Sequence, residues 1–117
     1  MEKVYEISLL IDFYGQLLTK RQYEVLDLHY NNDFSLSEIA EQLGISRQGV
    51  FDNLKRGKSI LDDLEQKLGL VKKFSEQKMK AQSILEAVNS ISRDVLSNKD
   101  KDNLEKIKNI VDEIING

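Results

Sequence analysis

The segment from Leu36 to Arg56, LSEIAEQLGISRQGVFDNLKR, constrains the fold of this chain most, because it has the pattern of two helices joined by a tight turn. Apolar residues recur at helical spacing on both sides of Gly44, which supplies the left-handed conformation that ends a helix at low cost. Ser35 with Glu38 forms a capping-box signature at the first helix, and Ser46 is placed to cap the second. The segment therefore predicts a helix-turn-helix.

A helix-turn-helix reads DNA by placing its second helix in the major groove, where exposed side chains reach base edges and flanking cations hold phosphates. In this chain Arg47 suits guanine, Gln48 suits adenine, and the later basic residues suit phosphates. The residues expected to contact DNA are Arg47, Gln48, Phe51, Asp52, Lys55, Arg56 and Lys58. Helical hairpins with a turn glycine also occur in proteins that bind no nucleic acid, so DNA binding is a separate hypothesis.

Two of these residues suit a DNA surface less well. Phe51 can touch a thymine methyl group or anchor a protein partner, and the Asp52 carboxylate is repelled by phosphate unless it accepts from cytosine. Residues 46–59 nevertheless hold four basic side chains against one acidic side chain. The whole chain has 17 basic and 20 acidic residues and a net charge of -3, so we expect weak, salt-dependent nonspecific binding that dimerisation would improve.

Amphipathic periodicity predicts helices along the rest of residues 1–74. The first is expected to end near Leu18, and a second starts at a cap formed by Thr19 and Gln22. The recognition helix is expected to run from Arg47 to about Leu68, with Gly69 as its C-terminal cap. Gly49 and Gly57 weaken that helix, and Gly49 is the candidate for close approach to a partner. The apolar stripe of the first helix is Val4, Ile7, Leu10, Ile11, Tyr14 and Leu18.

Residues 75–117 are predicted to form a helical hairpin, with helices from Ser75 to Leu96 and from Asp100 to Ile115. A mainly apolar seam recurs about every 3.5 positions, which is the spacing of paired helices. It consists of Ala81, Leu85, Val88, Ser92 and Val95, then Leu104, Ile107, Val111 and Ile114. A two-helix hairpin buries little surface alone, so this stripe packs on the N-terminal domain, on a second copy or on a client protein. We favour a homodimer. The expected partner contacts are Phe51, Leu85, Val88, Leu104, Ile107 and Val111.

Catalytic and cofactor sites find little support in the sequence. His29 is the single histidine, there is no cysteine, and phosphate-binding glycine loops are absent. We therefore expect no enzyme activity, no cofactor and no metal. The lack of cysteine suits a reducing cytoplasm, and no membrane span or export signal is expected, because the N-terminal segment has the pattern of an amphipathic helix.

The stretch TKRQYEVLDLHYNNDFSLSEIAEQLGISRQGVFDNLKRG resembles the promoter-reading fourth region of sigma factors. Three patterns, YxxxLLxDFYxxLLTxRQ, LDLHYxxDxSLxEIAE and SRQGVxDxxKR, resemble the YlxM family of small bacterial proteins over residues 1–74. That resemblance implies a cytoplasmic regulatory helix-turn-helix protein. It also implies a connection with the signal recognition particle, the machinery that delivers nascent membrane and secreted proteins, through gene neighbourhood.

Two hypotheses follow from different classes of protein. The first is a dimeric DNA-binding regulator that uses Arg47, Gln48 and Lys55 for its contacts. The alternative is an adaptor that binds the signal recognition particle protein and uses Phe51 as an apolar anchor. The chain departs from a sigma-factor reader at Phe51, Asp52 and Asn53, and this departure is what keeps the alternative open.

Overall fold

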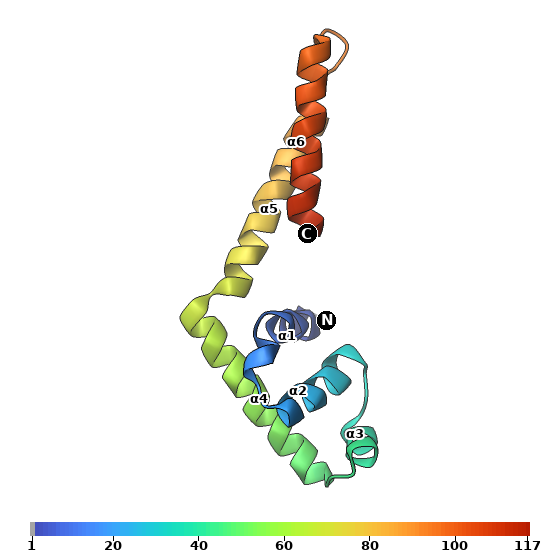
Figure 1. Cartoon of the computed structure of the whole chain (residues 1–117), viewed down its shortest axis with the longest axis vertical. Coiled ribbons are helices and arrows are strands. Elements are labelled where there is room, and N and C mark those ends of the chain that lie inside the picture. The colour runs from blue at the N-terminus through green and yellow to red at the C-terminus, as the bar shows by residue number, and fades with distance from the viewer. Residues whose placement is uncertain (1) are drawn as a thin grey trace. The chain divides into compact units, whose positions relative to one another are not determined.

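The computed structural model describes residues 2–117, with side chains from residue 6 onward, and its elements are all helical (Figure 1). The absence of strands within these residues confirms the all-α prediction. Val4 of the predicted first stripe lies outside the described side chains. The helices are α1 (Glu2–Tyr14), η1 (Gly15–Leu17), α2 (Lys20–Leu26), η2 (Asp27–Asn31), α3 (Leu36–Leu43), α4 (Arg47–Leu68), α5 (Leu70–Asn89) and α6 (Asn98–Asn116).

The chain divides into two units, Met1–Val71 and Lys72–Gly117. In the first unit α4 is the central helix, because α1, α2 and α3 all contact it. Apolar side chains from these four helices and the α1–α2 connection form one core, as their 3.6-residue periodicity requires. The core residues are Ile7, Leu10, Ile11, Tyr14, Leu18, Val25, Leu26, Ile39, Val50, Leu54 and Leu61.

The helix-turn-helix, α3 and α4, has the local geometry that its sequence predicts. The Ser35 hydroxyl accepts from the Glu38 amide at 3.1 Å, and the Glu38 carboxylate accepts from the Ser35 amide at 3.0 Å. Gly44 ends α3 at φ 67°, and the Ser46 hydroxyl accepts from the Gly49 amide at 3.0 Å. These caps fix where each helix of the motif begins and ends.

The capping box makes the stability of α3 depend on pH. Hydrogen bonds from Ser35 lower the pKa of Glu38 below its ordinary value of 4.5. A carboxyl group whose pKa falls on folding stabilises the fold above its ordinary pKa, and that contribution is lost as pH falls through the folded pKa. We expect the wild-type protein to lose more stability than Glu38→Gln when urea unfolding is measured first at about pH 6 and then at about pH 3. Equal losses would contradict this.

Of the two glycines inside α4, Gly57 is the one that another helix of the chain approaches closely. A Cβ atom at Gly57 would lie 2.7 Å from Leu26 Cδ1, and both residues are buried. At Gly49 the same atom would meet the Ser46 hydroxyl at 3.2 Å, within the same helix start. Gly57 therefore lets α2 pack against α4, and the prediction that it merely weakens the helix missed this role.

The second predicted helix continues into the π-helix η2 and ends in a strained turn. Asn31 belongs to η2, while Asp33 adopts φ 60°, an uncommon value for a residue other than glycine. The Phe34 carbonyl accepts from His29 Nδ1 at 2.8 Å, and the Phe34 amide donates to the Leu28 carbonyl at 3.0 Å. These bonds hold the turn against η2.

A partly buried hydrogen-bond network holds the junction between α4 and α5. The Tyr14 hydroxyl donates to Glu65 Oε1 at 2.7 Å and accepts from the Leu70 amide at 3.2 Å. Glu65 Oε1 also accepts from the Val71 amide at 3.0 Å. Burial and the Glu65 carboxylate raise the pKa of Tyr14, so the phenol stays a donor at neutral pH.

The second unit is a hairpin of α5 and α6, but the predicted bounds of its first helix are wrong. The helix begins at Leu70 because Gly69, at φ 62°, interrupts the helices for a single residue. It ends at Asn89, not Leu96, and the Ser90 hydroxyl donates back to the Glu86 carbonyl at 2.8 Å. Val95, a predicted seam residue, lies in the following loop and is 91% exposed. Ser97 caps α6, as its position predicts.

No helix within the part of the chain that the structure describes combines the length and apolar character that a membrane crossing needs.

Candidate nucleic-acid interface

The candidate DNA-binding side chains lie on the first half of α4, directly after the Ser46 cap. Residues on an α-helix advance by about 100° each, so Arg47, Gln48, Lys55 and Lys58 all fall within about 60° of Phe51. We call these five residues the reading face. Its members are exposed apart from Lys58, which is half-buried.

Two predicted contacts lie away from the centre of the reading face. Asp52 falls about 100° from Phe51 on the helical wheel, and Arg56 falls about 140° from it, although both are exposed. The structure therefore groups five of the seven predicted residues on one surface, leaves Asp52 on its flank and turns Arg56 away.

Asp52 acts on the reading face through Gln48. The Gln48 amide nitrogen Nε2 donates to Asp52 Oδ1 at 3.0 Å. This bond occupies one amide hydrogen and orients the side chain, while the amide oxygen and the second hydrogen retain their hydrogen-bonding capacity. Asn53 points elsewhere, because its side chain is half-buried and donates to the Gly49 carbonyl at 2.8 Å. A glutamine held in this way keeps hydrogen-bonding groups available on the reading face.

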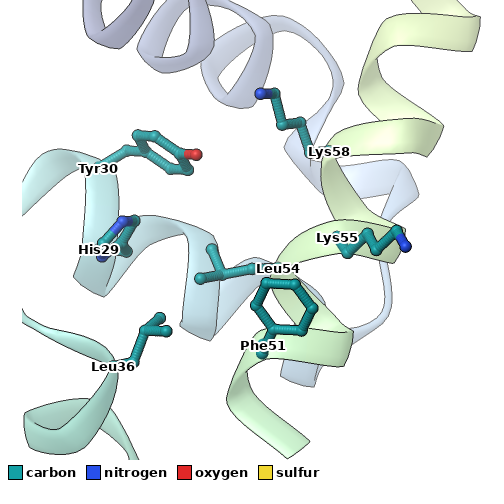
Figure 2. A pocket seen from close by; sticks show the side chains of 7 residues that line it. All are labelled: His29, Tyr30, Leu36, Phe51, Leu54, Lys55 and Lys58. Atoms are coloured by element: carbon teal, nitrogen blue, oxygen red, sulfur yellow. The ribbon is translucent and has the colours of Figure 1, made fainter. Parts of the chain in front are cut away.

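A hollow of about 450 Å³, which we call the Phe51 hollow, lies beside the reading face (Figure 2). Phe51 itself is 47% exposed at its edge. A second hollow of about 370 Å³ lies on the other side of Phe51, against Arg47 and Gln48. The Phe51 hollow is lined by His29, Tyr30, Leu36, Phe51, Leu54, Lys55 and Lys58. Sequence reasoning missed His29, Tyr30 and Leu36 as site residues, because no periodicity places η2 and the start of α3 opposite α4.

The predicted partner contacts on the hairpin divide into two groups. Val88, Leu104 and Val111 are buried within the hairpin itself, so their side chains are covered without a partner. Leu85 is half-buried and Ile107 is 41% exposed. The surface left for a partner therefore includes Ile107 and otherwise lies beside the predicted contacts.

That surface is an apolar face made by both helices of the hairpin. On α6, Ile107, Ile110 and Ile114 all lie on one side of the buried Leu104–Val111 stripe, and on α5 Ile84 lies on the corresponding side of the Ala81–Val88 stripe. Because the two helices run in opposite directions, these sides form the same face of the hairpin (Figure 1). Ile91 joins it through a small hollow shared with Leu104 and Ile107. We call Ile84, Ile91, Ile107, Ile110 and Ile114 the isoleucine face.

The opposite face of the hairpin is polar. Apart from the half-buried Leu85, the helical wheel places polar and charged side chains there. They are Lys78, Gln82, Lys101, Glu105, Lys108 and Asp112. The hairpin therefore has one face suited to water and one suited to an apolar partner.

The chain matches a family model described as "Putative helix-turn-helix protein, YlxM / p13 like" over residues 1–110. A UPF0122 protein of Acetivibrio thermocellus is 56% identical over 115 residues, which cover 98% of each chain. A UPF0122 protein of Desulforamulus reducens is 43% identical over 115 residues, covering 98% of this chain and 95% of the relative. One of Listeria monocytogenes is 43% identical over 109 residues, covering 93% and 97%. The matches include the hairpin as well as the helix-turn-helix, and the chain belongs to the UPF0122 family of YlxM/p13-like helix-turn-helix proteins.

Proposed function

We propose that this protein is a regulatory DNA-binding protein whose reading face enters the major groove of double-stranded DNA. The observation that carries the proposal is the reading face itself, an exposed surface at the start of a capped recognition helix that presents arginine, glutamine and two lysines. The helix-turn-helix family is a second support. The proposed activity needs no catalytic group or cofactor and places the protein in the cytoplasm with its DNA.

Each side chain has a distinct role in the proposed complex. Arg47 donates two hydrogen bonds from its guanidinium group to the edge of a guanine. Gln48, oriented by Asp52, forms hydrogen bonds with an adenine. Lys55 and Lys58 neutralise phosphates as α4 leaves the groove. Residues 46–59 carry a local excess of positive charge, although the whole chain has a net charge of -3. Base contacts therefore contribute more to specificity here than general attraction does.

The proposal is tested by selecting duplexes from a random double-stranded library with the purified protein at about 150 mM salt. Enrichment of a defined motif over successive rounds is the expected result. A pool that stays random while the protein remains folded would contradict sequence reading.

We also propose a homodimer, because a single recognition helix binds DNA weakly. The isoleucine face is the proposed contact surface. Residues 72–117 contain nine basic and eight acidic side chains, so two hairpins meet without strong charge repulsion. A second copy offers the same apolar face, and an isologous contact between identical patches forms a closed dimer.

A charge placed on the isoleucine face is expected to produce a monomer. Ile107→Asp puts a carboxylate into the proposed contact, where it would lose its hydration. Sedimentation of the wild-type protein should show a dimer and Ile107→Asp a monomer at the same concentration. Asn109→Asp is the matched control, because it adds the same charge to an exposed position on the other side of α6 and should remain dimeric. A wild-type monomer, or a dimeric Ile107→Asp, would contradict the proposed interface.

The exposure of Phe51 favours a second candidate function, an adaptor of the signal recognition particle. A large apolar side chain that is 47% exposed beside a hollow is a suitable anchor for a protein partner. In that case immobilised wild-type protein should retain purified signal recognition particle protein, and Phe51→Ala should retain several-fold less. Equal retention would remove Phe51 from the interface, and Tyr23→Ala, at another exposed aromatic residue, serves as the control.

A further inference from the structure

The Phe51 hollow has the size and composition of a small-molecule site. Its volume of about 450 Å³ falls within the usual range for such sites. Leu36, Phe51 and Leu54 supply apolar surface, and Tyr30 adds an aromatic ring. Figure 2 shows the two aromatic residues of η2 on one side and the α4 side chains on the other, with Leu36 at the start of α3.

The charge at this hollow is positive, in contrast to the unit that contains it. Lys55 and Lys58 are among the lining residues, and no acidic residue is. The first unit as a whole, residues 1–71, holds twelve acidic and eight basic side chains. Figure 2 shows Lys58 extending from α4 above the hollow, while Lys55 lines it next to Phe51 and directs its ammonium group away from the η2 side. Since lysine side chains have four flexible carbons, both ammonium groups can reach a ligand headgroup.

The backbone that forms the far wall is unusual. His29 and Tyr30 lie in the π-helix η2, a conformation that is rare and recurs at functional sites. Asp33, just beyond η2, holds a left-handed backbone at φ 60°. In this irregular segment the Tyr30 side chain reaches toward α4, and the His29 ring packs edge to face against it, with the two ring centroids 4.8 Å apart.

The polar groups of that wall are suited to an organic headgroup. His29 Nδ1 lies 2.8 Å from the Phe34 carbonyl, so Nδ1 carries the proton and Nε2 remains for a ligand. Burial, with a smaller contribution from the Asp62 carboxylate, raises the pKa of Tyr30, so its hydroxyl is a donor at neutral pH. In Figure 2 that hydroxyl points toward α4.

We propose that the Phe51 hollow binds a small amphipathic anion, an organic carboxylate whose apolar body lies against Leu36, Phe51 and Leu54 and whose headgroup pairs with Lys55 and Lys58. A small anion fits better than an extended polymer, because the hollow has room for one compact apolar body and its lining includes two lysines and no acidic residue. Burying the exposed Phe51 ring and neutralising two neighbouring ammonium groups are both favourable.

A bound anion would also regulate the reading face. Phe51, Lys55 and Lys58 belong to both surfaces, so a ligand that occupies the hollow removes the phosphate contacts and blocks the approach of a duplex. This consequence rests on the proposed DNA binding, whereas binding of the anion does not. Ligand and DNA are therefore expected to compete.

Binding is tested first without DNA, by titrating decanoate into the ¹⁵N-labelled full-length protein and following amide NMR shifts. We expect saturable shifts at residues 29–36 and 51–58. Lys55→Gln/Lys58→Gln should weaken binding at least about tenfold, since a charged hydrogen bond contributes about that factor. Lys20→Gln/Lys67→Gln, which removes two exposed lysines of the same unit that do not line the hollow, should bind as the wild type does. 1-Decanol, which has no charge, should bind more weakly than decanoate.

Several results would overturn the proposal. These are shifts confined to the isoleucine face, equal binding of decanol and decanoate, or equal affinity in the two lysine double variants. Shifts around the hollow caused by signal recognition particle protein but not by decanoate would assign it to a protein partner instead. In a second experiment, which tests the expected competition, decanoate is added to the complex of the protein with a selected duplex. Failure to bind decanoate while DNA binds rejects the hollow alone, and failure to bind DNA while decanoate binds rejects the proposed function alone.

Discussion

Replacing Arg47 and Lys55 together by alanine is expected to lower the affinity for a selected duplex by at least about a hundredfold. A bidentate arginine–guanine contact discriminates by about 1 to 3 kcal/mol, and a lysine–phosphate contact adds a salt-dependent contribution. Both side chains are exposed, so their removal should leave the fold unchanged. Fluorescence anisotropy with a labelled duplex measures the loss of affinity. The slope of log affinity against log salt concentration should become less steep by about one unit.

Arg56→Ala is the control for this experiment. Arg56 is also an exposed cation on α4, but it lies about 140° from Phe51 around the helix. Its removal should change affinity for the duplex only slightly. An equal loss in Arg56→Ala would show a general charge effect, and unchanged binding of the double variant would remove the reading face from the complex.

Replacing Gly57 by valine is expected to destabilise the first unit by about 3 kcal/mol, a large part of the stability of a small domain. A Cβ atom there lies 2.7 Å from Leu26 Cδ1, and Leu26 is fully buried and so has little room to move. Valine adds two further methyl groups to the same contact. Urea unfolding followed by circular dichroism measures the change.

The matched variant is Ser59→Val, two residues further along α4 at an exposed position. It introduces the same β-branched side chain into the same helix without a packing clash, and its stability should stay within about 0.5 kcal/mol of wild type. If Gly57→Val and Ser59→Val proved equally stable, α2 could not be packed on α4 as the structure describes.

Features encoded by neighbouring residues were predictable from the sequence. The caps at Thr19, Ser35 and Ser46 and the glycine ends at Gly44 and Gly69 all depend on residues within four positions, so their patterns predict their geometry. The exposed positions of α4 follow from its period. The predictions of an all-α fold and of the family are confirmed, because both also rest on local sequence patterns.

Features that depend on distant contacts were not predictable. Whether a helical glycine is a weakness or a packing site depends on what faces it, and Leu26, which faces Gly57, is remote in sequence. The bond from Tyr14 to Glu65 joins residues 51 positions apart, and no local pattern marks it. The early end of α5 also escaped prediction, because the apolar spacing continues through Val95 although the helix does not.

The candidate site divides in the same way. The grouping of Arg47, Gln48 and Lys55 on one exposed surface was predictable, because one helix carries all three. The Phe51 hollow required the positions of η2 and α3 against α4. The isoleucine face required knowing that α5 and α6 run antiparallel, since the seam pattern alone cannot separate buried residues from their exposed neighbours.

The proposed contact between the reading face and DNA can be tested by an NMR titration of the labelled protein with a selected duplex. Because each amide reports its own surroundings, the titration locates the contact surface without any substitution. If the reading face contacts DNA, we expect the largest shifts at residues 46–58 and smaller shifts at the start of α3. Shifts restricted to α5 and α6, or none at duplex concentrations that saturate a control binder, would contradict it.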